Sequence, residues 1–571
     1  MLDWLIRDVE ICDGTGGRPR FRGDIGLHAG EIVALGKVDE KARRTLDASG
    51  LFAAPGFIDV HTHYDCQISW DPYLTPSGWH GITTVVMGNC GFTIAPCHPD
   101  DRETLMRMLL YVEGMPTAAL AAGIRWEWES FPDYLAALER WQPALNVAAF
   151  VGHSAIRFFV MREAATQRAA TDEELEAMRC IVREAVRAGA WGLSSSESPT
   201  HFFGDGTPVP SRVAPREELQ ALASALRASP RGVIEIAPRN LLGTAEDKIH
   251  DQQFYAELAE QSGKLVSWAP LLHNPFEPEG ALRVIEDAAR WQARGVKVVP
   301  QVGCRPLEVR ITFGSSSIAT ENNPFWRPIL AKPEAERKAL LASPQFRDEL
   351  RSMSRGGGWV AALGPSWKQI FLRWSPAREH AAWLDQSVAD IAAARGQDEV
   401  DTLLDVSLET NLACQWGIPI MNTDEHIVGQ LLRHPAGLLA LSDAGAHVDT
   451  LADHSFSTHL LGHWVRTLGM LSWEEAVRLL TSVPARLYGI PQRGELRPGF
   501  AADVVLFDPQ RVGPAKTELW NDLPGGAHRL VQPAQGVEYV FVNGEPIVEQ
   551  GRPTEARPGI VLGRSNGRGH C

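Results

Sequence analysis

The segment "APGFIDVHTHYD", residues 54–65, decides the fold and points to the chemistry. An apolar run ends there in two histidines, His61 and His63, one residue apart. Side chains at positions i and i+2 of a strand point to the same face, so we expect both imidazoles to project together at the end of this strand. Two imidazoles at one place make half of a metal site. Two hydrogen-bonded histidines packed beneath a loop remain the alternative for such a pair taken alone.

Seven further segments of this kind follow, with helical patterns between them. One helix is expected to begin after Thr171, which has capping-box spacing with Glu174, and to stop at Gly189. Eight alternating units of strand and helix predict an α/β fold, a (β/α)8 TIM-type barrel with its active site at the carboxyl ends of the strands. The expected strands are "GFIDVHTH" (56–63), "GITTVVMGNC" (81–90), "NVAAFVGH" (146–153), "AWGLSSS" (190–196), "GVIEIAP" (232–238), "KLVSWAP" (264–270), "VKVVPQVG" (296–303) and "GLLALSDAG" (437–445).

Other strand ends carry side chains that can bind metal or move protons. Cys90 ends the second strand, His153 the third and Asp443 the eighth, while Glu197 follows the fourth. Asp443 has the place and type of a metal ligand that also acts as general base on a metal-activated water. Its alternative is to cap the following helix. Cys90 is either a ligand or a small buried apolar residue.

The two chain termini differ from the barrel region. Residues 1–53 and 485–571 consist of short strands and turns, and neither piece is large enough to fold alone. We therefore expect one small β-sandwich domain built from both termini, beside a barrel that spans residues 54–484. A segment at about 305–401, rich in Trp, Pro and Gly, fits no barrel unit and is predicted to be a lid inserted at the rim.

The composition excludes several classes of partner. A net charge of -15 argues against nucleic acid or an anionic membrane, so a small-molecule substrate is expected. No apolar run reaches the roughly 18 residues of a membrane helix. The N-terminus lacks the pattern of an export signal, and eight scattered cysteines suit a reducing cytoplasm. The sequence leaves the oligomeric state open, including a homo-oligomer.

Five segments together resemble a known family. "APGFIDVHTHYD", "GITTVVMGNCGFTIAP", "NVAAFVGHSAIR", "LSDAGAH" and "GELRPGFAADVVLFDP" are similar to the N-acyl-D-amino-acid deacylases (D-aminoacylases) of the amidohydrolase superfamily. The resemblance implies a metal-dependent barrel with a flanking β-sandwich, which hydrolyses an amide bond with metal-activated water. It also implies that the metal site includes His61, His63, Cys90 and Asp443.

Two strands depart from the pattern of this family. The family carries further histidine ligands at the ends of strands five and six, where this chain has Ala237 and Trp268 or their near neighbours. Neither residue can replace an imidazole, because neither offers a usable lone pair. We therefore predict one zinc ion held by His61, His63 and Asp443, with two ions as the alternative. Groups that could supply the missing ligands are His153, Glu197, His201, Glu235 and His273.

The predicted reaction is hydrolysis of a carbon–nitrogen amide bond in a small molecule. Asp443 would accept a proton from water and pass it to the leaving nitrogen, while His153 could stabilise the oxyanion. Arg239 could bind a substrate carboxylate, or form a structural ion pair. Trp268 would make the pocket more aromatic, which opens the alternative of an aryl or cyclic amide or an ester. A barrel that binds a metabolite without catalysis is the remaining alternative.

Overall fold

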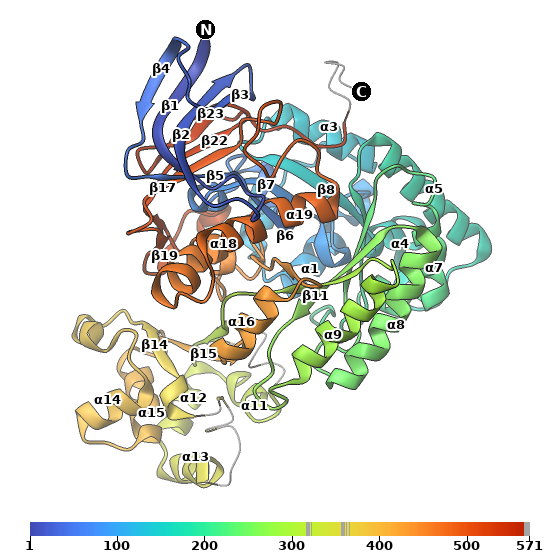
Figure 1. Ribbon diagram of the computed structural model, residues 1–571. Helices are drawn as coiled ribbons and strands as arrows, with labels where there is room; N and C mark the ends of the chain where they lie inside the picture. Colours follow the sequence, from blue (N-terminus) through green and yellow to red (C-terminus); the bar gives the residue numbers. More distant parts are fainter. Residues whose placement is uncertain (316–319, 321–322, 356–359, 361–362, 365, 565–571) are drawn as a thin grey trace. The chain divides into compact units, whose positions relative to one another are not determined.

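The computed structural model describes residues 1–571 apart from 316–319, 321–322, 356–359, 361–362, 365 and 565–571 (Figure 1). Cys571 and part of the tryptophan-rich segment therefore lie outside the described residues. The chain forms two compact units. The first contains Met1–Leu272, Glu277–Arg305 and His426–Cys571, and the second contains His273–Phe276 and Pro306–Glu425.

Eight parallel strands in chain order form the barrel of the first unit. Every residue of β7 and β8 is buried, as expected for parallel strands covered by helices. An isolated parallel bridge between Thr62 and Ala444 joins the first strand to the segment after the last one. The barrel predicted from eight segments is therefore confirmed. Its strands are β6 (Phe57–Thr62), β7 (Ile82–Met87), β8 (Asn146–Gly152), β9 (Gly192–Ser196), β10 (Val233–Ala237), β11 (Leu265–Leu271), β12 (Val298–Val302) and β16 (Leu438–Leu439).

Amphipathic helices cover the outer face of this sheet. The helix α5 (Asp172–Ala188) has the predicted capping box between Thr171 and Glu174 and ends at Gly189. Its burial pattern leaves one apolar stripe against the barrel and a charged face outside. Other helices of this unit are α1 (Arg102–Val112), α4 (His153–Met161), α7 (Arg216–Ser224), α8 (Ala245–Ser262), α9 (Gly280–Ala293), α18 (Trp473–Leu480) and α19 (Ser482–Tyr488).

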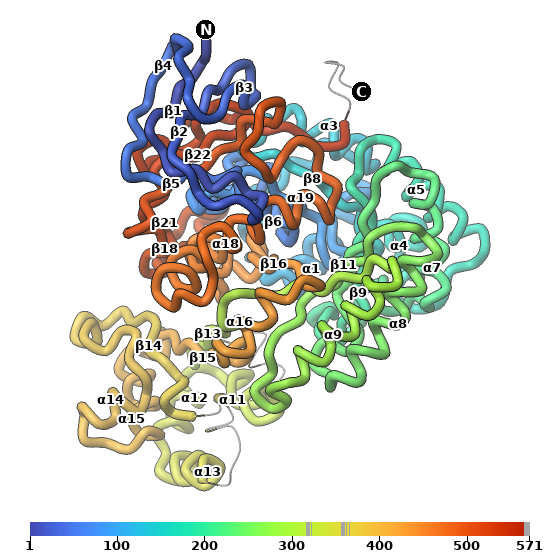
Figure 2. The backbone as a smooth tube through the Cα atoms, viewed as in Figure 1, coloured from blue at the N-terminus to red at the C-terminus, as the bar shows by residue number. Residues whose placement is uncertain are grey.

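Strands from both chain termini form a separate sheet in the same unit. N-terminal β5 pairs antiparallel with C-terminal β17, with Ala54 opposite Val505. Figures 1 and 2 show the blue N-terminal strands beside the red C-terminal strands. The prediction of one β domain built from both termini is confirmed. The sheet contains β1 (Leu2–Ile11), β2 (Phe21–His28), β3 (Glu31–Gly36), β4 (Ala42–Asp47), β5 (Phe52–Pro55), β17 (Val504–Phe507), β22 (Val537–Val542), β23 (Glu545–Glu549) and β24 (Arg552–Pro553).

A single glycine links the two sheets. Gly56 stands between β5 and β6, and a Cβ atom there would lie 2.1 Å from Thr83 Oγ1. Such an approach is impossible for any other residue without a shift of the backbone or of the Thr83 side chain. This close contact fixes where the chain leaves the terminal sheet and enters the barrel.

The second unit has a hydrophobic core of its own. Its three strands are antiparallel, in the order β13 (Leu307–Ile311), β15 (Gln415–Met421) and β14 (Phe371–Trp374). Trp326, Leu403 and Trp416 are fully buried in its core. The predicted insertion at about 305–401 thus falls in a folded unit that continues to Glu425. Its helices include α12 (Glu334–Ala342), α13 (Pro344–Arg355), α14 (Val388–Arg395) and α15 (Glu399–Glu409).

The described residues contain neither a membrane-spanning helix nor a disulfide bond. Among the described residues, no helix combines the length and apolar character needed to cross a membrane. The seven cysteines within the described part of the chain are all free thiols, and six of them are buried. The thiols therefore act as small apolar side chains or as ligands, and they do not cross-link the fold.

Candidate metal centre

The end of β6 presents His61 and His63 to the barrel mouth. Asp59 pairs with Val85 and Thr62 with Met87, so β6 carries one extra residue between these pairs. Such a bulge re-aims the side chains beside it and is frequent next to active sites. The two rings lie with their centroids 5.4 Å apart, and both side chains are buried.

A glutamine fixes the orientation of His61. The Nδ1 atom of His61 lies 2.9 Å from Gln301 Oε1. An amide oxygen only accepts, so Nδ1 donates and the Nε2 lone pair stays available for a metal. The amide nitrogen of Gln301 donates to Ser267 Oγ at 3.1 Å, which agrees with this orientation. Sequence reasoning missed Gln301, although a polar residue within the buried strand "VVPQV" was a usable signal.

A buried carboxylate forms an ion pair with His63 from behind, without a hydrogen bond between the two groups. The Nδ1 atom of His63 lies 3.3 Å from Glu113 Oε1, which leaves Nε2 toward Asp443. Glu113 follows helix α1 and is buried. A carboxylate behind an imidazole is the usual support of a metal-binding histidine. No periodicity or motif marks Glu113 in the sequence, and only the fold brings it to His63.

Cys90 and Asp443 complete the cluster. Cys90 Sγ lies 3.6 Å from His61 Nε2, while Asp443 Oδ1 lies 3.6 Å from His61 Nε2 and 3.2 Å from His63 Nε2. Ligand atoms that share one tetrahedral zinc ion are about 3.3–3.6 Å apart, given bonds of about 2.0–2.3 Å. Within the described residues, the ligand atoms of His61, His63 and Cys90 all lie within 4.8 Å of one another. The structure thus brings together the four residues predicted at the metal site.

The charges of the cluster fit a cation. Burial lowers the pKa of His61 to about 4, so this imidazole is neutral at pH 7. Burial also disfavours a charged His63, yet the carboxylates of Glu113 and Asp443 outweigh it and raise the pKa of His63 to about 9. Burial raises the pKa of Glu113 to about 7 and that of Glu235 to about 8.

Asp443 keeps its charge in this setting. Burial works against its carboxylate, but the hydrogen bond and charge of His63 hold the pKa of Asp443 below its usual value. Glu113 Oε1 and Glu235 Oε1 are buried and have no hydrogen-bond partner among the described residues. Acids left in this state beside two imidazoles and a thiol form a donor set that a divalent ion such as zinc would satisfy.

Three other predicted residues form ion pairs or networks away from the cluster. His153 bonds through Nδ1 to Ser195 Oγ and through Nε2 to Glu218, both at 2.9 Å. Both of its ring nitrogens are therefore engaged, which argues against an oxyanion role. Arg239 donates to Glu197 at 2.7 Å, and Glu197 also pairs with Arg216. For Arg239 the structure shows the ion-pair alternative.

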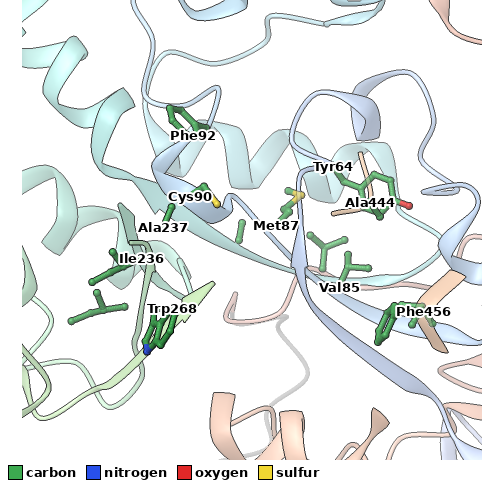
Figure 3. Close-up of a cluster of buried hydrophobic side chains, with 14 of the residues drawn as sticks. Tyr64, Val85, Met87, Cys90, Phe92, Ile236, Ala237, Trp268, Ala444 and Phe456 are labelled. Atoms are coloured by element: carbon green, nitrogen blue, oxygen red, sulfur yellow. The ribbon is translucent and has the colours of Figure 1, made fainter. Parts of the chain in front are cut away.

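Trp268 corrects one expectation about the pocket. It alternates along β11 with Ser267, the residue that faces Gln301 and the cluster. Its own ring therefore lies on the helix-facing side of the sheet, 6.4 Å from the Tyr255 ring of α8. In Figure 3 the Trp268 ring lies near Ile236, its register partner.

Two alanines stand near the ends of strands five and six. Ala237 shares the face of Glu235 on β10, and Ala269 follows Trp268 where the pairing of β11 with β12 becomes irregular. Ala237 lies beside Cys90 in Figure 3. On strand six, the ring of Trp268 packs against Tyr255, and the next residue, Ala269, has no donor atom in its side chain. Among the groups named to fill this gap, Glu235 reaches the cluster, while His201 bonds to Ser196 Oγ.

A small pocket opens beside Asp443. Its wall combines the segment after β16 with the loop after β6 and with Arg529 and Leu530 near the C-terminus. The Arg529 guanidinium is held by Asp522 and by the Thr75 carbonyl group. The pocket is therefore lined by Asp443 together with polar and apolar side chains in similar number.

Residues 44–342 and 360–548 match the model of the amidohydrolase family, and the chain belongs to this family. It is a metal-dependent hydrolase of carbon–nitrogen bonds other than peptide bonds, and the alternative of a barrel without catalysis finds no support. Its relatives place it among the N-acyl-D-amino-acid deacylases, as the sequence resemblance implied.

Particular relatives align over nearly the whole chain. The N-acyl-D-glutamate deacylase of Alcaligenes xylosoxydans xylosoxydans is 30% identical over 99% of this chain and 97% of its own length. The D-aminoacylase of the same organism is 28% identical over 99% of this chain and 98% of its own length. Among solved structures, the N-acyl-D-glutamate deacylase from Bordetella bronchiseptica, complexed with zinc and a phosphonate inhibitor, is 28% identical. The superposition covers 98% of this chain and 99% of the Bordetella chain, with a TM-score of 0.66.

Proposed function

We propose that the protein binds one zinc ion through His61, His63, Cys90 and Asp443 and hydrolyses the amide bond of an N-acylated D-amino acid. One observation carries this proposal. Asp443 Oδ1 lies 3.6 Å from His61 Nε2 and 3.2 Å from His63 Nε2, so the three groups can share one metal ion. The substrate class is drawn from the relatives, which are named for N-acyl-D-glutamate and other D-amino acids.

The residues of the chain divide the work between binding and proton transfer. A bound zinc ion supplies Lewis-acid polarisation of the scissile carbonyl and activates water at neutral pH. Asp443 takes a proton from the attacking water and delivers it to the leaving nitrogen, a role for which its low pKa keeps it ionised. Gln301 accepts a hydrogen bond from His61 Nδ1 and so holds this imidazole in the ligating tautomer, while Glu113 forms an ion pair behind His63. The pocket beside Asp443 receives the substrate.

A second candidate is hydrolysis of an aryl or cyclic amide, or of an ester. The observation that favours it is the pair Ala237 and Ala269, which replaces large side chains by methyl groups beside the cluster. More room at this wall suits a bulkier or more rigid acyl group.

Metal analysis and a substrate panel test the proposal together. The purified protein is assayed for zinc and for hydrolysis of N-acetyl-D-amino acids, their L enantiomers, aryl amides and cyclic amides. Asp443→Asn should lower turnover about 10²–10⁴-fold, while Asp172→Asn on the exposed start of α5 should leave it unchanged. Near wild-type turnover in Asp443→Asn would refute the assignment of the base. An Asp443-dependent activity confined to aryl or cyclic amides would establish the second candidate.

Three expectations complete the proposal. We infer a cytoplasmic enzyme with a small-molecule substrate, and we keep the homo-oligomer as an expectation to be tested by light scattering. We also propose that the unit around residues 306–425 acts as a lid. Support for the lid comes from its position in the sequence, directly after strand β12 and before β16 of the barrel.

A further inference from the structure

Glu235, a buried acid on β10, is not one of the four proposed metal ligands. Glu235 is fully buried and faces the cluster. Its Oε2 atom accepts a hydrogen bond of 2.6 Å from the backbone N–H of Cys90. Its Oε1 atom has no hydrogen-bond partner in the described part of the chain and lies 3.9 Å from His61 Nδ1. An acid is costly to bury, so a carboxyl group held here with one oxygen unbonded points to a task at the cluster.

The turn that carries Cys90 is strained. Gly88, Cys90 and Gly91 all have positive φ, at 81°, 55° and 77°. Cysteine disfavours this left-handed conformation because its Cβ crowds the following carbonyl group. Residues held this way persist when their surroundings fix them, and they gather at functional sites. The conformation of Cys90 therefore needs an anchor.

Three side chains anchor the turn by its backbone N–H groups. Asp65 Oδ2 accepts from Gly88 at 2.9 Å, and Ser194 Oγ accepts from Gly91 at 3.0 Å. Glu235 is the one that holds Cys90 itself. Its bond fixes the residue whose Sγ lies 3.6 Å from His61 Nε2. Without it, the backbone of Cys90 can relax toward ordinary φ values and swing the sulfur away.

We propose that Glu235 is a positioning residue of the metal centre, which holds Cys90 in the left-handed turn so that its thiolate serves as a ligand. The inference rests on the proposed metal centre. This role for Glu235 explains how Cys90 stays in place as a ligand when the neighbouring residues Ala237 and Ala269 offer no donor atom. Glu235 acts through the acceptor oxygen that it gives to Cys90, and its negative charge is not required for that bond.

Cobalt substitution separates this role from a merely structural one. The full-length protein is loaded with Co²⁺, and the thiolate-to-cobalt charge-transfer band and the affinity for Co²⁺ are measured. Glu235→Leu, which keeps volume but removes the acceptor, should lose most of the band and bind Co²⁺ about 10–100-fold more weakly. Glu235→Gln retains an acceptor oxygen and should keep both. Ser194→Ala, which frees only Gly91, should keep the band, and Cys90→Ser identifies its source.

The Glu235 variants distinguish the positioning role from its alternatives. A full band and unchanged affinity in Glu235→Leu would overturn the inference and leave the metal centre intact. Equal losses in Glu235→Gln and Glu235→Leu would also overturn it, because the charge would then matter rather than the acceptor. If Glu235→Leu fails to fold by circular dichroism, Glu235→Ala takes its place. A wild-type protein without a cobalt band would overturn the proposed thiolate-containing centre and this inference with it.

Discussion

Replacing Gln301 by leucine tests how the centre orients His61. The substitution removes the side-chain oxygen that accepts from His61 Nδ1 at 2.9 Å. The buried N–H would then lose this bond, which costs about 1–3 kcal/mol of unfolding free energy in the metal-free protein. The imidazole would also be free to change tautomer or rotate. Loss of such a support lowers metal affinity about 10–100-fold, or about 1.4–2.7 kcal/mol.

Two measurements check these magnitudes on the same samples. Urea denaturation of the metal-free protein gives the change in unfolding free energy, and competition with a chelator gives the zinc affinity. Ser267→Ala is the matched control, because it removes a partner of the Gln301 amide nitrogen and leaves the bond to His61 in place. Zinc affinity in Gln301→Leu equal to that of the wild type would refute the tautomer argument. An equal loss in Ser267→Ala would attribute the effect to packing of the barrel interior.

Three further predictions address pH, the sheet junction and the lost ligands. The pKa of His63 is raised to about 9, above the 6.5 of the unfolded chain, so its stabilisation of the metal-free protein is fully present below about pH 6.5. It is lost as the pH rises through 9, by about 3 kcal/mol in urea denaturation, and His63→Gln should flatten this dependence. Gly56→Ala should lower the unfolding free energy by about 1–3 kcal/mol through its clash with Thr83, and an unchanged melting temperature would contradict that close contact. Ala237→His with Ala269→His should raise the zinc content of the purified protein above that of the wild type, as elemental analysis would show, and an unchanged content would mean that these positions do not face the cluster.

The two alanines bear on the altered metal site that the sequence resemblance predicts. Replacing a ligand by alanine removes a donor atom without disturbing the strand, because a small apolar residue is easily accommodated in a buried parallel sheet. The fold can therefore stay close to that of its relatives while the metal site and the pocket change.

The sequence by itself determined the elements and the residues at their ends. Eight buried strands correspond to eight apolar runs, and the capping box at Thr171 marked the start of α5, because periodicity and capping act over a few neighbouring residues. Since all parallel strands of a barrel end at one rim, the order of strands and helices along the chain was enough to bring His61, Cys90 and Asp443 to one place.

Only the tertiary structure decided which residues support the two imidazoles. Glu113 and Gln301 reach the histidines from positions 50 and 240 residues away in the sequence, as their contacts with His63 and His61 show. The register of β11 decided that Ser267, and not Trp268, faces Gln301 and the cluster. Register and long-range contact depend on how strands pair, and a shift of one residue reverses every side chain. Local sequence patterns carry no information on that choice, which is settled when the barrel closes.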